Sequence, residues 1–327
     1  MARPSPAWTP AQRDGVSASR VVVSAGPWVS LAAFLTLRLP GGTDWPARLA
    51  RGDVLDAQGR PLALDAPCTP GALLWYWRNP PPEQRVPFEI TVLHQCAQLV
   101  VVDKPHFLPV TPGGRHLQET VLVRLQRLLG MPTLAPMHRL DRETAGVLAF
   151  TVQPAQRHAY AALLRCHQVH KVYEAIAPWS ADLALPLLCR HRLAQRPDSF
   201  MQMQVVPGMP NAETRIALLR HVRPAAPTAD QQDGHSSDAP AGPLALYRLT
   251  PRTGQRHQLR VQLSALGLPI VGDRIYPHLW PEPAPGATPD YHQPLQLLAR
   301  SLAFVDPLTG EPRCFTSQRR LQLDVAG

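Results

Sequence analysis

The sequence lacks the signatures of several common protein classes. Its five cysteines form no CxxC pair and stand at positions 68, 96, 166, 189 and 314. An odd number of scattered cysteines disfavours a disulfide framework or a cysteine-rich zinc site, and favours a reducing compartment. The longest early apolar stretch, 28–37, has about half the length that a membrane span needs. The N-terminus has no apolar region of the kind found in secretory signals. We therefore expect a cytoplasmic protein without a membrane segment.

Cofactor and metal motifs are also missing. There is no glycine-rich dinucleotide loop and no Walker lysine motif. The HxE and PCxxC pattern of zinc nucleobase deaminases does not occur either. His167 and His170 could be read as a metal pair, but no third ligand has a suitable spacing, which favours solvated or core-edge histidines. We expect no metal and no small-molecule cofactor.

The composition is that of a basic globular protein. Apolar residues make up 45% of the chain and charged residues 17%. Lys and Arg number 33 against 24 Asp and Glu, which gives a net charge of +9. This balance favours a polyanionic partner such as nucleic acid, because each neutralised phosphate releases counterions. A positive surface that serves only solubility is the alternative.

The chain divides into three parts by composition. Residues 1–18 are rich in Pro, Ala and Arg and predict a flexible tail. Residues 19–80 predict a small module of two short helices and hairpin strands, and 81–327 the main domain. Within that domain, 221–243 has low complexity and predicts a disordered surface loop, because strand-like sequence resumes directly after it.

Hydrophobic patterns predict both strands and helices in the main domain. Strands are expected at 98–103, 146–152 and 172–177, and helices at 120–130 and 155–168. In the first helix, Gly130 ends the pattern. Its apolar face is expected to hold Val121, Leu125, Leu128 and Leu129, with Arg124 and Arg127 on the other side. The fold class is therefore α+β.

The segment HRLDRETAG, 138–146, carries the strongest chemical signal. Asp141 lies between Arg139 and Arg142, directly before a predicted strand. Nearby cations favour an ionised carboxylate, and such a carboxylate can act as a nucleophile toward an electron-poor carbon. The alternative is a loop of surface salt bridges, which are common and contribute little stability.

Two later segments contain further candidates. KVYEA, 171–175, places Lys171 and Tyr173 at the start of a strand. RTGQRHQLRVQL, 252–263, has a glycine-containing turn, then Arg256, His257 and Arg260, on a predicted amphipathic helix. We expect Arg256 and Arg260 to share one side of its first turns, from which a cation could reach the carboxylate. Taken alone, Tyr173 is more often a half-buried strand aromatic, and Arg260 is more often a surface cation of a helix.

These three segments, in this order, resemble the RluA family of pseudouridine synthases. HRLDRETAG is similar to the family's HRLDxxTSG, KVYEA to KxYxA, and TGQRHQLRVQL with GLPIVGDRIY to TGRxHQIRVHL with GxPIxGDxxY. VVDKPHFLPV, 101–110, and LLARSLAFVDPLTGE, 297–311, resemble two more family segments. The resemblance spans about residues 88–320.

The resemblance implies a fold and a reaction. The fold would be a pseudouridine synthase domain with a mixed, mostly antiparallel central sheet flanked by helices, preceded here by a small N-terminal module. That module is loosely similar to the ribosomal-protein-type RNA-binding module often fused ahead of this domain. The reaction would be conversion of uridine to pseudouridine in rRNA or tRNA, after the base leaves its stack. It needs no cofactor, and a monomer is the usual state in the family.

The resemblance also assigns roles to residues. Asp141 would attack the target uridine, Tyr173 would pack on the uracil and help remove its ring proton, and Arg260 would pair with Asp141. Arg139 would support the flipped nucleotide and fill its gap. RNA contacts are expected from the cationic residues and one histidine around these motifs: Arg139, Arg142, Lys171, Arg256, His257, Arg124 and Arg127.

Some positions depart from the family pattern. Gln255 stands where an Arg is usual, which puts one RNA contact in doubt, although Arg256 could substitute. Gln262 and Leu298 replace two histidines, and Ala145 a serine. Two other functions stay open, an inactive RNA-binding protein on the same scaffold and an N-glycosidase that releases the base without rejoining it.

Overall fold

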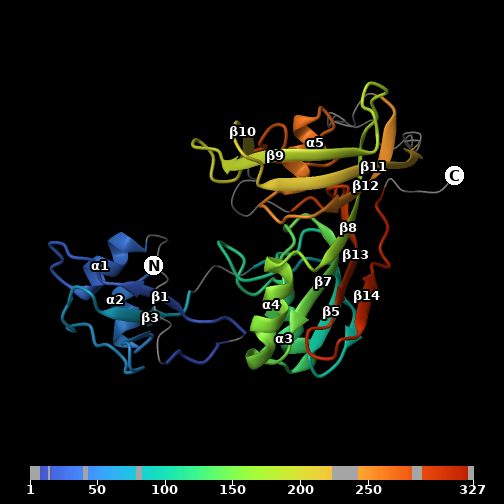
Figure 1. The fold of residues 1–327 in the computed structure, drawn as a ribbon. Coiled ribbons are helices and arrows are strands. Elements are labelled where there is room, and N and C mark those ends of the chain that lie inside the picture. The colour runs from blue at the N-terminus through green and yellow to red at the C-terminus, as the bar shows by residue number, and fades with distance from the viewer. Residues whose placement is uncertain are drawn as a thin grey trace. The chain divides into compact units, whose positions relative to one another are not determined.

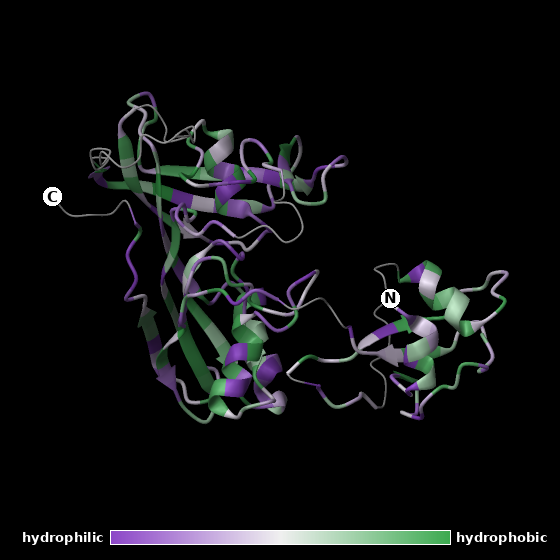
Figure 2. Ribbon diagram, turned by 180° about the vertical axis from the view of Figure 1, so that it is seen from behind, coloured by the Kyte–Doolittle hydropathy of each residue, from purple (hydrophilic) through white to green (hydrophobic). Residues whose placement is uncertain are grey.

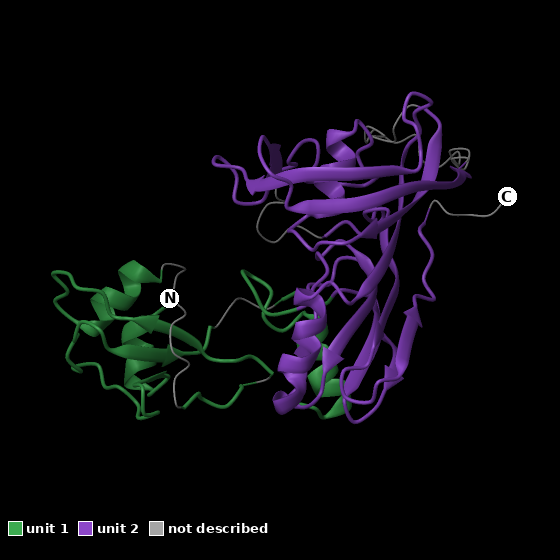
Figure 3. Ribbon diagram, in the orientation of Figure 1, with its two compact units in different colours: residues 1–85, 111–132 green, residues 86–110, 133–327 purple. Residues whose placement is uncertain are grey.

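The structure, a computed structural model, describes residues 8–13, 15–39, 43–78, 83–222, 242–281 and 289–322. The chain forms two compact units, coloured separately in Figure 3. The first comprises 1–85 and 111–132, and the second 86–110 and 133–327. The first unit thus contains the predicted module 19–80 together with the helical segment 111–132.

The N-terminal part of the first unit is a small three-stranded sheet with two helices. The antiparallel strand order is β1 (Ser19–Val22), β3 (Leu73–Tyr76), β2 (Val54–Leu55). Helix α1 (Leu31–Arg38) begins at Ser30 and α2 (Trp45–Ala50) at Asp44, whose side chains accept hydrogen bonds from backbone N–H groups three residues on. Apolar side chains of both helices and the sheet form one core. The predicted two short helices are confirmed.

Part of the predicted tail contacts this module. The Arg13 guanidinium lies 3.7 Å from the Trp77 ring centroid and 2.9 Å from an oxygen of Asp53. Val16 is buried. Residues 1–7 and 14 lie outside the described residues, as do 223–241 of the predicted loop 221–243.

Helix α3 (Val121–Leu129) confirms the predicted helix but not its buried face. Thr120 caps its start, and Gly130 ends it with φ +65°, a left-handed conformation that glycine adopts without strain. Leu128, expected to be buried, is 67% exposed, whereas Val123 is buried. The physical reason is a distant segment: a Cβ on Gly15 would lie 3.0 Å from the Val123 side chain, so the N-terminal chain covers that side.

The second unit is built on an eleven-stranded sheet (Figure 1). Its main path runs β10-β9-β11-β12-β8-β13-β7-β5-β4, with β14 on β13 and β6 on β7. The strands are β4 (Thr91–Gln95), β5 (Leu99–Lys104), β6 (Ala135–Pro136), β7 (Ala145–Thr151), β8 (His170–Pro178), β9 (Leu187–Gln195), β10 (Met203–Val206), β11 (Ala212–Val222), β12 (Leu244–Pro251), β13 (Leu297–Val305) and β14 (Pro312–Thr316). The helices are η1 (Pro154–Gln156), α4 (Arg157–Arg165) and α5 (Gln258–Ala265).

The pairing of these strands confirms the expected sheet. Strands β7 and β13 pair in parallel, and the other pairs recorded for the described residues are antiparallel. The sheet is thus mixed and mostly antiparallel, with helices beside it, as an α+β fold requires. Strands β5 and β7 are buried along their whole length, and much of this part of the sheet is green, hydrophobic, in Figure 2. No helix among the described residues is long and apolar enough to cross a membrane.

The parallel pair depends on a glycine. Gly146 on β7 has φ +112°, and a Cβ there would lie 2.2 Å from the carbonyl oxygen of Ala299 on β13. Only glycine allows the two backbones to approach so closely. This contact brings the beginning of β7, and the loop that precedes it, against the centre of the sheet.

Candidate active site

The loop between β6 and β7 carries Asp141. Residues 137–144 contain a turn in which the Thr144 N–H donates to the Asp141 carbonyl at 3.1 Å. The Asp141 side chain is 29% exposed. An accessible carboxylate therefore stands at the start of a rigid, buried strand.

A buried lysine clamps this loop from one side. Lys104, at the end of β5, is fully buried and donates to the carbonyls of Pro105 at 2.9 Å, Leu108 at 2.7 Å and Arg142 at 2.9 Å. Three acceptors satisfy the three N–H groups of an ammonium. Burial lowers the Lys104 pKa to about 7, although nearby carboxylates oppose this. The bond to Arg142 fixes the backbone one residue after Asp141.

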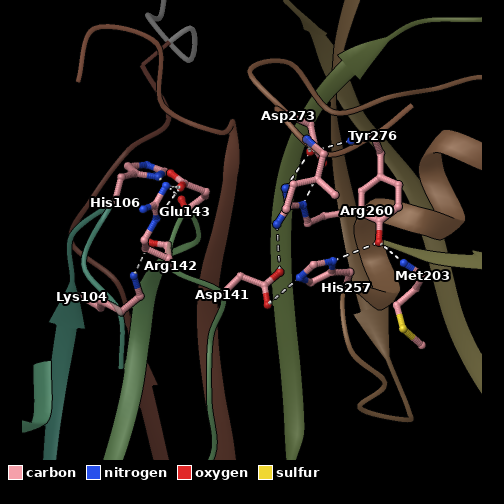
Figure 4. Close-up of polar contacts among 11 residues, drawn as sticks. Lys104, His106, Asp141, Arg142, Glu143, Met203, His257, Arg260, Asp273 and Tyr276 are labelled. Carbon is pink, nitrogen blue, oxygen red and sulfur yellow. Dashed lines mark hydrogen bonds and ion pairs between the residues drawn. The ribbon is translucent and has the colours of Figure 1, made fainter. Parts of the chain in front are cut away.

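A histidine holds the next residue of the loop. His106 Nδ1 lies 2.7 Å from the Glu143 carbonyl oxygen, so this nitrogen carries the proton and donates. Burial lowers the pKa of His106 to about 4, which leaves the ring neutral near pH 7. Lys104 and His106 thus hold two successive carbonyls behind Asp141, as Figure 4 shows.

Arg260 on α5 pairs with Asp141 from the opposite side (Figure 4). Its Nη1 lies 3.3 Å from Asp141 Oδ2, while Nε and Nη2 contact the two oxygens of Asp273 at 2.8 and 2.6 Å. The Arg260 side chain is 2% exposed and that of Asp273 is 1% exposed. Burial disfavours the Arg260 charge, but the bonds and charges of the two carboxylates raise its pKa above the ordinary value. The guanidinium is therefore a fixed cation.

Asp273 is itself fixed by backbone groups. Its Oδ1 accepts from the N–H groups of Ile275 at 2.8 Å and Tyr276 at 3.0 Å. The bidentate ion pair and these bonds together orient the guanidinium. The carboxylate of Asp273 thus sets the position from which Arg260 reaches Asp141.

Helix α5 is anchored by two buried glutamines. Gln258 accepts from the Thr253 hydroxyl at 2.8 Å and donates to the Thr214 hydroxyl at 2.9 Å. Gln262, in place of the family's histidine, accepts from Thr214 at 2.6 Å and donates to the Cys189 carbonyl at 3.3 Å. Each buried amide is satisfied, so this substitution is accommodated by strands β9 and β11.

His257 lies beside the other oxygen of Asp141. Its Nε2 is 3.9 Å from Asp141 Oδ1, and its Nδ1 is 3.0 Å from the hydroxyl of Tyr276. That hydroxyl accepts from the Met203 N–H at 2.7 Å. Burial lowers the His257 pKa to about 4, against the effect of Asp141. Only 8% of the side chain is exposed, so His257 offers RNA little surface.

Tyr173 lies near the same carboxylate, on β8. The half-buried side chain packs against a core cluster that includes Leu259 of α5. Burial raises the pKa of its phenol, and the charge of Asp141 raises it further. The structure thus brings Asp141, Tyr173 and Arg260 together, and it keeps the phenol protonated.

Two of the predicted RNA contacts flank Asp141 in sequence. Arg139 is exposed and has no side-chain partner among the described residues. Arg142 pairs with Glu143 at 2.6 Å and keeps 42% of its side chain exposed. The Arg139 guanidinium is therefore open to an anionic ligand.

Lys171 and Arg256 lie near the turn that precedes α5. Lys171 donates to the Thr253 carbonyl at 3.4 Å, and burial lowers its pKa. Arg256 is exposed, bonds Gln195 at 3.1 Å and lies 5.1 Å from the Phe200 ring centroid. The expectation that Arg256 shares a helix side with Arg260 is wrong, because α5 begins at residue 258 and Arg256 stands in the turn before it.

Arg124 and Arg127 belong to the other compact unit. Arg124 forms an ion pair with Glu119, and its side chain is 14% exposed. Arg127 donates to the Gln118 side chain at 2.9 Å. RNA contacts at these two residues stay a prediction.

Sequence reasoning missed several residues of the site. Asp273 and Tyr276 stand in the segment GLPIVGDRIY, and Lys104 in VVDKPHFLPV, so the motifs themselves were the available signal. The contacts that these residues make could not be predicted, because neither a buried ion pair nor a lysine bonded to backbone carbonyls produces a periodic sequence pattern. Among the described residues, no group of three His, Cys, Asp or Glu is placed to hold a metal ion.

Comparisons with known proteins identify the family. The family profile described as RNA pseudouridylate synthase matches residues 98–265. An uncharacterized RNA pseudouridine synthase, slr1592 of Synechocystis, is 30% identical over 232 residues, which are 71% of this chain and 73% of that protein. The dual-specificity RNA pseudouridine synthase RluA of Haemophilus influenzae is 29% identical over 262 residues, 76% of this chain and 98% of its own.

A solved structure supports the fold. Human RNA pseudouridylate synthase domain containing 1 superposes with a TM-score of 0.52 at 20% identity, and the match covers 73% of this chain and 86% of that one. The family profile alone spans more than half of the chain. The chain therefore belongs to the RluA family of pseudouridine synthases, isomerases that act on RNA.

Proposed function

We propose that this enzyme converts uridines of structured rRNA or tRNA to pseudouridine, with Asp141 as the nucleophile and after extrusion of the target base. The observation that carries the proposal is the Asp141 carboxylate. It is 29% exposed, yet its oxygens face a fixed guanidinium at 3.3 Å and an imidazole at 3.9 Å. A carboxylate so oriented is set up to attack.

The reaction matches what the site offers. The bond between the ribose C1′ and N1 of uracil breaks, C1′ joins C5, the C5 proton leaves, and N1 gains a proton. Neither oxidation nor transfer from a second substrate takes place. A carboxylate nucleophile can hold the nucleotide while the base turns, and a fixed cation beside it balances its negative charge.

The surroundings support a role for base extrusion. Removing a base from its stack costs a few kcal/mol, which contacts made only in the extruded state must offset. The protonated Tyr173 phenol lies near Asp141 and presents an aromatic ring against which a pyrimidine can pack. Arg139, exposed and without a side-chain partner among the described residues, is free to occupy the gap in the RNA.

Substitution of Asp141 tests the nucleophile. We expect Asp141→Asn to abolish pseudouridine formation and to leave the RNA dissociation constant within about threefold. The exposed Asp182→Asn is the matched control, because its carboxylate lies outside the site. Turnover by the Asp141 variant would refute the assignment. Abasic sites formed by the wild-type enzyme would indicate an N-glycosidase. Uridine left unchanged by the wild-type enzyme would indicate an RNA-binding protein without activity.

The RNA target needs a cellular experiment. Shape and loops, which motifs do not encode, decide which RNA such enzymes select. Pseudouridine mapping of total RNA from cells with and without this chain should show sites that disappear together with it. Sites restricted to mRNA would contradict the proposed rRNA or tRNA substrate.

A further inference from the structure

We propose that His257 is a positioning residue for Asp141, and that the hydroxyl of Tyr276 sets the tautomer in which it acts. This inference rests on the proposed role of Asp141 as nucleophile. It is carried by the chain of contacts drawn on the right of Figure 4, which runs from the Met203 N–H through Tyr276 and His257 to Asp141.

The first step is the direction of the bond between Tyr276 and His257. The Tyr276 oxygen already accepts the Met203 N–H at 2.7 Å. Among the described residues, His257 Nδ1, at 3.0 Å, is the acceptor paired with this hydroxyl. Buried donors are almost always satisfied, so the phenol donates its proton to Nδ1. The proton of a neutral imidazole then resides on Nε2.

The second step is the charge of the ring. Buried beside the cationic Arg256 and Arg260, His257 has its pKa lowered to about 4, with Asp141 and Asp273 acting in the opposite direction. The ring is therefore neutral near pH 7. It presents one N–H to Asp141 and adds no positive charge beside the carboxylate.

The third step concerns the carboxylate. His257 Nε2 lies 3.9 Å from Oδ1, and Arg260 Nη1 lies 3.3 Å from Oδ2 of Asp141. Each oxygen thus faces a different donor. At 3.9 Å the imidazole N–H is farther from Oδ1 than a hydrogen bond allows, and catalytic contacts of this kind commonly shorten only when substrate binds. In the substrate-bound state the shortened contact from His257 then fixes the plane of the carboxylate, while Arg260 supplies the charge.

The backbone explains why the ring points this way. His257 precedes α5 and has φ +53°, ψ +21°, a left-handed conformation. Asn, Asp and His enter this region more readily than other residues with side chains. The turn buries the imidazole between Asp141 and Tyr276 (Figure 4). A surface role for the ring would not require this conformation.

A pair of substitutions separates positioning from packing. His257→Asn suits the left-handed backbone and keeps an acceptor for Tyr276, but it is too short to reach Asp141. His257→Gln places an amide N–H at the position of Nε2. In single-turnover reactions at saturating RNA, we expect the Asn variant to be about 10- to 100-fold slower than the unmodified enzyme, with an unchanged dissociation constant. The Gln variant should be at least about tenfold faster than the Asn variant.

A double substitution tests the role of Tyr276. Tyr276→Phe alone should slow the chemical step. It removes the hydroxyl that donates to Nδ1, so the ring proton of His257 is no longer confined to Nε2. In the His257→Gln background the same change should cost almost nothing, since the amide does not depend on the phenol. Equal losses in both backgrounds would overturn the role assigned to Tyr276.

The remaining outcomes are distinct from each other. A wild-type rate for His257→Asn, or equal rates for the Asn and Gln variants at equal melting temperature, would overturn the inference. Activity of Asp141→Asn in the same assay would instead refute the proposed nucleophile. Loss in the Asn variant, recovery in the Gln variant and an inactive Asp141→Asn would support both.

Discussion

Replacement of Arg260 by methionine should destabilise the second unit as well as inactivate the enzyme. The substitution leaves Asp273 with 1% of its side chain exposed and two backbone N–H donors, but without a countercharge. Breaking a buried ion pair by removing one partner costs about 3–5 kcal/mol. Asp141, 29% exposed, can be rehydrated and adds little to this cost.

The size of the effect can be read from the melting temperature. In a unit of this length, each kcal/mol lowers it by about 2–4 °C, so Arg260→Met should lose roughly 6–20 °C. Adding Asp273→Asn removes the stranded charge and should restore part of this loss. Activity should stay absent in both variants, since neither offers a cation to Asp141.

The assay is thermal unfolding by circular dichroism, with pseudouridine formation measured on the same preparations. Arg274→Met, at an exposed ion pair with Asp290, is the matched control and should change the melting temperature by less than about 2 °C. A shift of that small size for Arg260→Met would refute the reasoning. So would a double variant whose loss equals the sum of the two single losses.

Three further predictions concern the frame of the site. Lys104→Met leaves three carbonyls without a donor, at about 1–3 kcal/mol each, and should lower both the urea midpoint and the turnover rate. Gly146→Ala should prevent folding of the second unit, because its Cβ would lie 2.2 Å from a carbonyl oxygen; Gly254→Ala, with its nearest atom at 3.6 Å, should fold normally by circular dichroism. Three buried histidines have pKa values lowered by burial: His106, His138 and His257. As pH falls from 7.5 to 5.5, the unfolded chain takes up their protons first, so stability should fall by up to about 1.4 kcal/mol for each, and an unchanged urea midpoint would contradict this.

The sequence named the three proposed catalytic residues because each stands in a short, specific motif. Asp141, Tyr173 and Arg260 were assigned by the resemblance, and the fold brings them to one place. Strands such as β5 and β7 were predictable too, since their residues 99–102 and 147–150 form continuous apolar runs. Motifs and hydrophobic periodicity are local properties, so both can be recognised without knowledge of the fold.

What the sequence could not predict depends on distant partners. Val123 is covered and Leu128 exposed because of a segment more than one hundred residues away, at Gly15. His257 was predicted only to contact RNA, because nothing local indicates its left-handed backbone or its burial. Arg256 was wrongly predicted to lie in the helix, because hydrophobic spacing does not define the residue at which α5 begins.

The pair of carboxylates around one guanidinium has an electrostatic consequence for substrate entry. Asp141 and Asp273 carry two negative charges against the single positive charge of Arg260, so this group is anionic by one unit. We expect such a group to disfavour a phosphate and to accept an uncharged nucleobase with its sugar. The polyanionic backbone would then be held by cations outside the group, such as the proposed contact Arg139. With attraction at the rim and repulsion at the centre, we expect the base and sugar, not the phosphate, to reach Asp141.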